Sequence, residues 1–430
     1  MVFRPLPAAT FFVALLVALP VLSVGASLLA PGTGGTLAHL AATVLPETIG
    51  NSLWLCLIVG LLVASMGTVS AWLVAMREFP GRRLFEWALL LPMAMPAYVL
   101  AYTYTDFLQF VGPVQTWLRE SFGWRRGDYW FPEVRSLPGA AAMLGFVLYP
   151  YVYLLARTAF LERAAGMIEA ARVVGASPAR VFFRVSVPLA RPAITVGVAL
   201  ALMETMADYG TVAYFAVPTF TTGIYRAWFA LGDRAAAAQL AVGLLGFVLL
   251  LLALERIGRG RARYHDTTLR RGRGRLRLRG FPAVLAFLAC LMPVLLGFLL
   301  PAGLLLRLGL GEDGVAFASR FLQLAGNSLL VASLAAVIAG LLAVLLGYGA
   351  RLARRPRHAM LAQAANRLVG LGYAVPGSVI AVGVLIPVTR FDHWLAAAWE
   401  HASGSHPGLI LTGGIPALIY AYLELILSFA

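Results

Sequence analysis

The chain has 430 residues, of which 60% are hydrophobic and only 12% are charged, and its mean hydropathy is +0.83. A soluble domain carries about a quarter charged residues, so this composition excludes an ordinary soluble protein and indicates an integral membrane protein. The net charge of +15 comes from arginine alone, and these arginines form short clusters between apolar runs. That distribution is typical of membrane loops, so we expect no nucleic-acid partner.

Long apolar runs predict membrane-spanning helices of about 20 residues each. Because the runs are continuous and do not alternate with polar residues, they predict helices and not the strands of a barrel. We therefore expect an all-α polytopic membrane protein whose first run is an uncleaved span. The ten predicted spans lie near 10–30, 51–76, 86–110, 138–157, 193–217, 236–255, 281–306, 327–350, 368–388 and 409–430.

The arginine clusters also predict the orientation of these spans. If the N-terminus is cytoplasmic, 25 of the 34 arginines fall in cytoplasmic segments. Cytoplasmic loops of bacterial membrane proteins carry such an excess of positive charge. The sequence thus predicts a multi-pass protein of the bacterial inner membrane with a cytoplasmic N-terminus.

Two stretches of the chain resemble each other and predict an internal repeat. "GNSLWLCLIVGLLVASMG" from Gly50 is similar to "GNSLLVASLAAVIAGLLA" from Gly326. Each is followed by a basic turn and then by an apolar run with a central proline, Pro96 or Pro376. The two prolines predict paired kinks that could belong to a translocation path, with packing geometry as the alternative.

The repeat predicts three parts of the chain in the same membrane orientation. Residues 1–255 form a first domain, 256–280 a basic cytoplasmic linker near anionic lipid headgroups, and 281–430 a second domain. The second copy ends soon after the tyrosines near 420, before any counterpart of the polar stretch that follows the tyrosines near 149. We expect it to be truncated.

That polar stretch is "IEAARVVGASPARVFFRVSVPLARPAI", residues 168–194. Its pattern predicts two short helices, the first ending at Gly175 and the second beginning at Ser177 and Pro178 and ending before Pro188. Apolar side chains beside arginines predict a helix that docks a soluble partner. An interfacial amphipathic hairpin is the alternative, and the pattern alone leaves both open. The predicted docking side chains are Val181, Phe182, Val185, Arg180 and Arg184.

The stretch resembles the cytoplasmic EAA loop of ABC importer permeases. It keeps every spacing of that motif and differs only in Val185 and Val187, where the family has isoleucine and leucine. The resemblance implies a tandem repeat of a type I ABC importer permease domain, the second copy truncated, with an ATPase-coupling loop at 168–192. The coupling residues that it implies are Glu169, Ala170, Ala171, Gly175, Arg180 and Pro188.

The same resemblance implies the partners. They are two copies of an ABC ATPase subunit, which bind ATP and Mg²⁺, and a periplasmic substrate-binding protein, while this chain is no enzyme and holds no cofactor. The segment 200–233 looks like that of ferric-iron importer permeases, which are similar to thiamine, polyamine and phosphonate permeases. The resemblance therefore implies ferric-iron import, with these substrates as alternatives.

Glu204 and Asp208 lie four residues apart in a predicted span and thus share one helical face. Carboxylates in a membrane segment are costly and usually face a cavity or a partner. With Tyr209, they could line the path of a cation or position a gate. Alternatively, they form a structural pair that bonds to the backbone or to Thr205, Tyr209 or Thr211.

Two other functional classes compete with an ABC permease. An ion-coupled secondary transporter would use Glu204 and Asp208 as its coupling site. A membrane-embedded enzyme is disfavoured because the six histidines are scattered along the chain and suggest no metal site. The chain has no GxxxxGK[ST] phosphate-binding motif, which suits a permease that depends on a separate ATPase.

Overall fold

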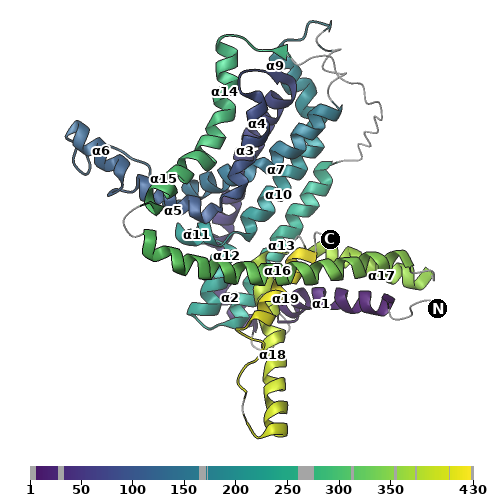
Figure 1. Ribbon diagram of the computed structural model, residues 1–430. Coiled ribbons are helices and arrows are strands. Elements are labelled where there is room, and N and C mark those ends of the chain that lie inside the picture. The colour runs from purple at the N-terminus through teal and green to yellow at the C-terminus, as the bar shows by residue number, and fades with distance from the viewer. Residues whose placement is uncertain are drawn as a thin grey trace. The chain divides into compact units, whose positions relative to one another are not determined.

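The computed structural model describes residues 6–27, 33–163, 171, 173–259, 276–310, 314–352, 356–372, 375–405 and 407–427. Within these residues the chain is almost wholly helical (Figure 1), and the only strands are two short segments that pair in parallel. Helices satisfy every interior backbone hydrogen bond within one segment, which is what a lipid environment requires. The predicted all-α polytopic class is confirmed.

The elements follow one another along the chain with short connections. Their bounds are α1 (Leu6–Ser27), α2 (Thr33–Thr43), α3 (Leu45–Met76), β1 (Arg77–Glu78), α4 (Arg82–Ala88), η1 (Leu91–Ala94), α5 (Ala97–Leu108), α6 (Pro113–Phe122), α7 (Leu137–Arg163), α9 (Pro178–Val181), η2 (Phe182–Ser186), α10 (Val187–Ala207), α11 (Gly210–Tyr214), α12 (Phe220–Tyr225), η3 (Arg226–Ala230), α13 (Arg234–Arg259), β2 (Leu276–Arg277), α14 (Phe281–Val294), η4 (Leu295–Leu299), α15 (Leu300–Gly309), α16 (Gly314–Leu352), α17 (Pro356–Leu371), α18 (Gly377–Ser403) and α19 (Ile415–Leu427).

Eight helices among the described residues are long and apolar enough to cross a membrane, or nine if one bent pair counts as a span. The described residues therefore hold fewer spans than the ten expected. The predicted span at 86–110 is the bent pair, in which Arg82–Ala94 and Ala97–Phe122 meet at 89°. The predicted span at 409–430 contains only the shorter α19. Hydropathy averages over a window, so it does not detect a break within an apolar run.

The helices pack into two compact units. Unit 1 contains Met1–Pro46, Gly223–Leu249 and Glu312–Ala430, and unit 2 contains Glu47–Thr222 and Leu250–Gly311. In unit 1, α1 packs against α16, α17 and α18. In unit 2, α14 and η4 pack against α4, η1 and α7. The first helix of each predicted repeat copy thus packs with the later helices of the other copy.

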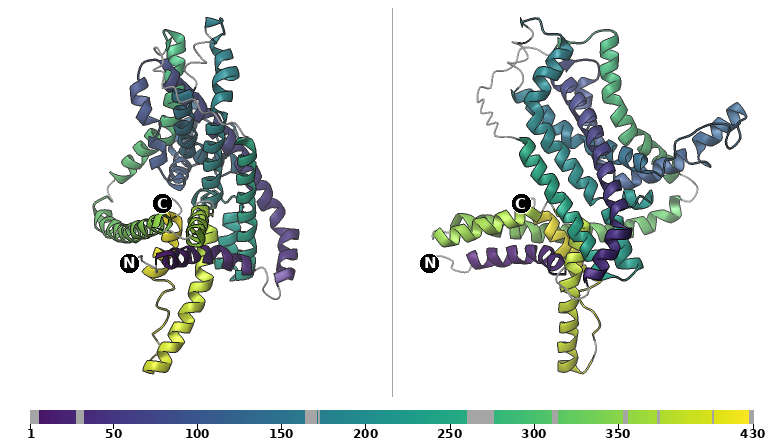
Figure 2. Two further views of the ribbon diagram at one scale, coloured as in Figure 1. Left: turned by 90° about the vertical axis from the view of Figure 1, so that its right-hand side faces the viewer. Right: turned by 180° about the vertical axis from the view of Figure 1, so that it is seen from behind.

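The core of unit 2 is built where α3 and α10 approach α7 (Figures 1 and 2). A Cβ atom on Gly67 of α3 would lie 2.6 Å from Cβ of Val152, and one on Gly197 of α10 would lie 2.7 Å from its Cα. No larger residue fits at either position. Membrane helices commonly use such small residues for close approach, because association there depends on packing contacts.

The two predicted kink prolines have the same local structure. Pro96 (φ −61°, ψ 133°) and Pro376 (φ −60°, ψ 142°) each stand in extended conformation directly before a helix, α5 and α18 respectively. Each proline carbonyl accepts hydrogen bonds from the amides three and four residues later. The equivalent positions of the repeat therefore start equivalent helices.

We expect Gly67→Ala to destabilise unit 2, because the added methyl group overlaps Val152 and the rigid backbone of α7. Overpacking of this kind costs about 1–3 kcal/mol. Thermal unfolding in detergent should show a lower midpoint. The matched control is Gly60→Ala on the same helix, where the new Cβ lies 3.6 Å from the nearest atom and alanine favours the helix. Equal midpoints for the two variants would contradict the packing argument.

Candidate functional site

A cavity of about 340 Å³ lies where η1 and α5 meet α7 and α10 in unit 2. Most of its lining residues are apolar, and three of them carry side-chain oxygens. The predicted residues Pro96, Glu204 and Asp208 all line it, whereas Tyr209 does not and Pro376 belongs to unit 1. The complete lining is Met93, Met95, Pro96, Ala97, Leu144, Val147, Leu148, Tyr151, Glu204, Ala207 and Asp208.

Asp208 ends α10 and holds the start of α11. Its carboxylate accepts hydrogen bonds from the Thr211 amide (3.0 Å), the Thr211 hydroxyl (3.0 Å) and the Val212 amide (3.2 Å). Its carbonyl accepts a fourth bond from the Thr221 hydroxyl at 2.7 Å. The side chain thus satisfies amides at a helix start, as a capping residue does, although it also borders the cavity.

Glu204 lies one turn earlier on α10 and is half-buried. Its carboxylate hydrogen-bonds to the Tyr151 side chain of α7. Tyr151 was not among the predicted site residues. Alternation in "YPYVY" could have indicated it, because Tyr149 and Tyr153 share the opposite helical face and donate to the carbonyls of Leu89 and Glu86.

The polar stretch has the predicted turn. Gly175 is left-handed (φ 81°), and the amide of Ala176 donates to the carbonyl of Ala171 at 3.1 Å. The Ser177 hydroxyl then accepts from the Arg180 amide at 3.4 Å and caps α9. Glu169 and Ala170 lie outside the described residues.

The second predicted helix does not end before Pro188. Instead α9, η2 and α10 form one apolar helix over Pro178–Ala207, 30 residues long. The π-helical turn η2 ends at Ser186, which places Pro188 in the first turn of α10. Within the continuous helix Pro188 removes one backbone donor, and a local π-helical turn is a known way for a membrane helix to accommodate such a proline.

The exposed face of the stretch differs from the predicted docking face. Val181 is buried, and the ring of Phe182 packs on Trp72 of α3 with ring centroids 4.9 Å apart. The exposed apolar side chains are Val173 (88%), Val174 (87%) and Phe183 (69%). The prediction was wrong about Val181, Phe182 and Val185 because this apolar face packs on the chain's own core and on Trp72, whereas Arg180 and Arg184 are exposed.

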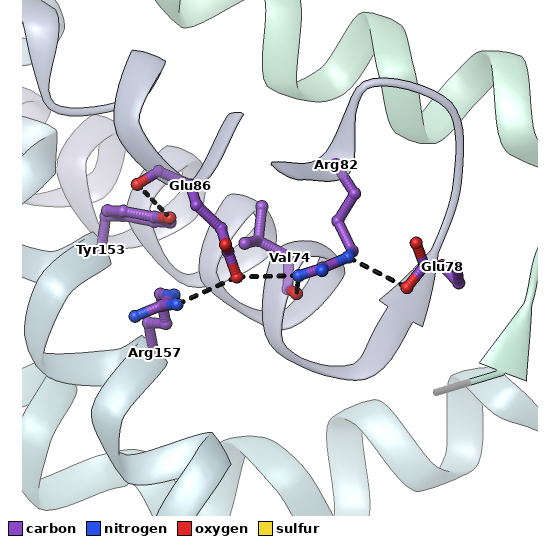
Figure 3. Close-up of polar contacts among 6 residues, drawn as sticks. All are labelled: Val74, Glu78, Arg82, Glu86, Tyr153 and Arg157. Atoms are coloured by element: carbon purple, nitrogen blue, oxygen red, sulfur yellow. Dashed lines mark hydrogen bonds and ion pairs between the residues drawn. The ribbon is translucent and has the colours of Figure 1, made fainter. Parts of the chain in front are cut away.

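A charged network fixes the neighbouring ends of α3, α4 and α7 (Figure 3). The buried Arg82 contacts Glu86 at 2.8 Å and Glu78 at 3.0 Å, and Arg157 of α7 contacts the same Glu86 oxygen at 3.1 Å. Arg82 also donates to the carbonyl of Val74 at the end of α3. Beside it, the guanidinium of Arg77 lies 4.4 Å from the Trp72 ring centre. The surface on which Phe182 packs is thus held rigid.

Among the described residues no group of three or more histidine, cysteine, aspartate or glutamate side chains could hold a metal ion. The oxygens of the cavity belong to Tyr151, Glu204 and Asp208. These three side chains provide few oxygen ligands, so they could form transient contacts with a solute that moves through the cavity.

Comparison with known proteins gives the family context. Residues 58–259 match the family described as "Binding-protein-dependent transport system inner membrane component". This range contains the cavity, the polar stretch and the charged network.

Three curated relatives carry names of transport permeases. The Fe(3+)-transport system permease protein FbpB 2 of Haemophilus influenzae is 25% identical over 350 residues, covering 79% of this chain and 63% of the relative. The molybdenum transport system permease protein ModB of Escherichia coli K12 is 29% identical, covering 49% and 96%. The probable sulfate transport system permease protein cysT of Nephroselmis olivacea is 32% identical, covering 36% and 52%. The chain thus spans between half and two thirds of FbpB 2 and cysT.

Among solved structures, a bacterial alginate ABC transporter, in complex with an alginate pentasaccharide-bound periplasmic protein, is similar. The TM-score is 0.46 with 17% sequence identity, over 56% of this chain and 88% of that chain.

We expect mutation to distinguish the structural contribution of Asp208 from that of Glu204. Asp208→Asn places an NH₂ group or a weaker acceptor against the donors of Thr211 and Val212, so the thermal midpoint in detergent should fall by an amount equivalent to about 1–3 kcal/mol. Glu204→Gln keeps an oxygen for Tyr151 and should leave the midpoint almost unchanged. An equal loss of stability in both variants would show that Glu204 also has a structural role.

Proposed function

We propose that this chain, which belongs to the binding-protein-dependent transport system inner membrane components, is the permease subunit of an ATP-driven ABC importer for ferric iron. One observation carries the proposal. A single helix, Pro178–Ala207, runs from the exposed turn at Gly175 to the cavity at Glu204, within the segment that matches the family. Force applied at the turn would therefore reach the cavity wall directly.

The turn is the docking surface for the ATPase in this proposal. Val173, Val174 and Phe183 expose apolar side chains, and exposed apolar patches mark sites of interaction. The packing of Phe182 on Trp72, held by the charged network, gives the docked partner a firm attachment to α3 as well. ATP and Mg²⁺ bind to the partner, so this chain moves solute but performs no chemistry. Two ATPase copies and a periplasmic binding protein complete the assembly.

The chemistry of the cavity favours a cation. An ionised Glu204 would attract a cation and repel an oxyanion such as sulfate or molybdate. Among the relatives reported above, the one named for Fe(3+) transport also covers the largest share of the chain. Ferric iron is therefore the proposed substrate.

Uptake of radioactive iron tests the function. We expect cells that express this chain, together with its partner P-loop ATPase and binding protein, to accumulate ⁵⁵Fe(III), and to lose this uptake when the ATPase gene is deleted. Radioactive sulfate and molybdate serve as the alternative substrates. Iron uptake without the ATPase would support an ion-coupled secondary transporter, and uptake of an oxyanion would overturn the proposed substrate.

The docking role is tested at the left-handed turn. Gly175→Val should strain the backbone by about 1–2 kcal/mol and weaken ATPase association roughly tenfold, because β-branched residues rarely adopt a positive φ. Gly175→Asn is the matched control, since asparagine tolerates this conformation. Co-purification of the ATPase with each variant gives the comparison. Equal recovery with both variants would show that the turn does not form the contact.

A further inference from the structure

The segment after α5 in unit 2 contains a helix that the transport mechanism does not use. The polypeptide from Ala97 to Phe122, which comprises α5 and α6, is bent by 89° relative to the preceding Arg82–Ala94. In Figure 1, α6 extends sideways, away from α3, α7 and α10 of the same unit, and the rear view in Figure 2 shows the same arrangement. Only four residues, 109–112, separate α6 from the end of α5.

The polar face of α6 is turned toward the protein. Gln115 is buried, and its amide donates to the carbonyl of Leu108 at 2.8 Å. The Tyr129 hydroxyl donates to the Gln115 side-chain oxygen at 2.7 Å. One turn later Arg119 donates to the carbonyl of Phe110 at 2.8 Å, and its guanidinium lies 4.2 Å from the Phe110 ring centre. These bonds fix the rotation of α6 about its axis.

The outer side of α6 carries large aromatic side chains beside the exposed Glu120 and Ser121. Trp117 is 61% exposed and Phe122 is 58% exposed, and Val111 and Trp130 beside the helix are exposed as well. The rings form a continuous surface, because Phe122 stacks on Trp124 with centroids 4.7 Å apart. A helix on a soluble surface normally buries its large apolar side chains against the core. An exposed aromatic cluster of this size therefore marks a site that contacts something apolar.

We propose that α6 is an interfacial helix whose outer face is inserted into the lipid bilayer. The short connection 109–112 can span only about 15 Å, so α6 stays near the level at which α5 leaves the membrane. Tryptophan is the side chain most typical of this boundary, and the exposed Arg125 and Arg126 complement lipid phosphates. Lipid thus suits the aromatic centre of this surface and the two arginines beside it.

The predicted orientation of the chain determines which leaflet of the bilayer contains α6. This inference rests on the proposed function only because it requires the chain to span the membrane. With a cytoplasmic N-terminus, α6 lies in the extracytoplasmic leaflet. There it anchors the far end of α5, whose first residues, Pro96 and Ala97, form part of the cavity wall. The bilayer would then fix the position of one wall of the cavity.

Spin labels at single cysteines test the depth of α6. The native Cys56 and Cys290 are buried, and replacing them with alanine removes residual labelling. The full chain, with Trp117→Cys or Phe122→Cys, is labelled and reconstituted in phosphatidylglycerol and phosphatidylethanolamine vesicles. Collision rates with oxygen, which enriches in lipid, and with a water-soluble nickel complex are then compared. Leu61→Cys, on the exposed face of α3, is the hydrocarbon reference, and Ser405→Cys, in the exposed turn after α18, is the aqueous reference.

We expect both α6 labels to collide at least fivefold more with oxygen than with nickel, relative to the label at Ser405. Labels that behave like Ser405 would place α6 in water, and labels protected from both reagents would place it under protein, so either result overturns the proposal. The Leu61 label shows whether a negative result refutes the membrane-spanning architecture or only the interfacial position of α6. If it too behaves like Ser405, the membrane-spanning architecture fails, whereas a lipid-exposed Leu61 with water-exposed α6 labels refutes the interfacial helix alone.

Discussion

The close approach of three helices at Val152 is the constraint on which the rest of unit 2 depends. Gly67 and Gly197 allow α3 and α10 to contact α7 where any Cβ would overlap it. This contact sets the rotation of α7, and the residues on either side of Val152 then point in fixed directions. Tyr151 faces α10 and meets Glu204, while Tyr153 faces α4 and donates to the carbonyl of Glu86. The cavity and the charged network are therefore two consequences of one packing contact.

The continuous Pro178–Ala207 helix could transmit movement from the exposed turn to the packed core of unit 2. Because η2 carries the helix past Pro188, one continuous helix connects the exposed turn at Gly175 with the cavity. The helix end before Pro188 that the sequence predicted would have separated the two. The packing of Phe182 on Trp72 adds a second connection, from the same turn to α3. Movement of a partner at the turn would thus shift α10 and α3 together against α7.

Features that depend on a few adjacent residues could be predicted from the sequence. Features that depend on packing between helices distant in the sequence could not. Composition predicted the helical membrane class, and glycine and serine chemistry predicted the turn at Gly175 and the cap at Ser177. Hydropathy overestimated the spans because it does not detect the break near Pro96. The apolar docking side chains were misassigned because an apolar helical face does not reveal whether it packs on a partner or, as here, on the chain's own core and Trp72. The alternation of tyrosines placed Tyr151 on the opposite helical face from Tyr149 and Tyr153, but only the packing of α7 showed that this face meets Glu204.

The location of the helix breaks gives an independent reason to place transport at the cavity. Pro96 precedes α5 and Asp208 follows α10, and both have extended backbone (ψ 133° and 129°) and line the same cavity. Irregular backbone at membrane depth leaves polar groups without helical partners, which is tolerated only where protein or water satisfies them. Asp208 supplies such partners to the start of α11, while the space between the breaks remains open. Discontinuous helices that meet at a cavity are a recurring way to build a solute site within a membrane. A role confined to packing would not require both breaks to face the same space, and this arrangement therefore favours passage of solute between them.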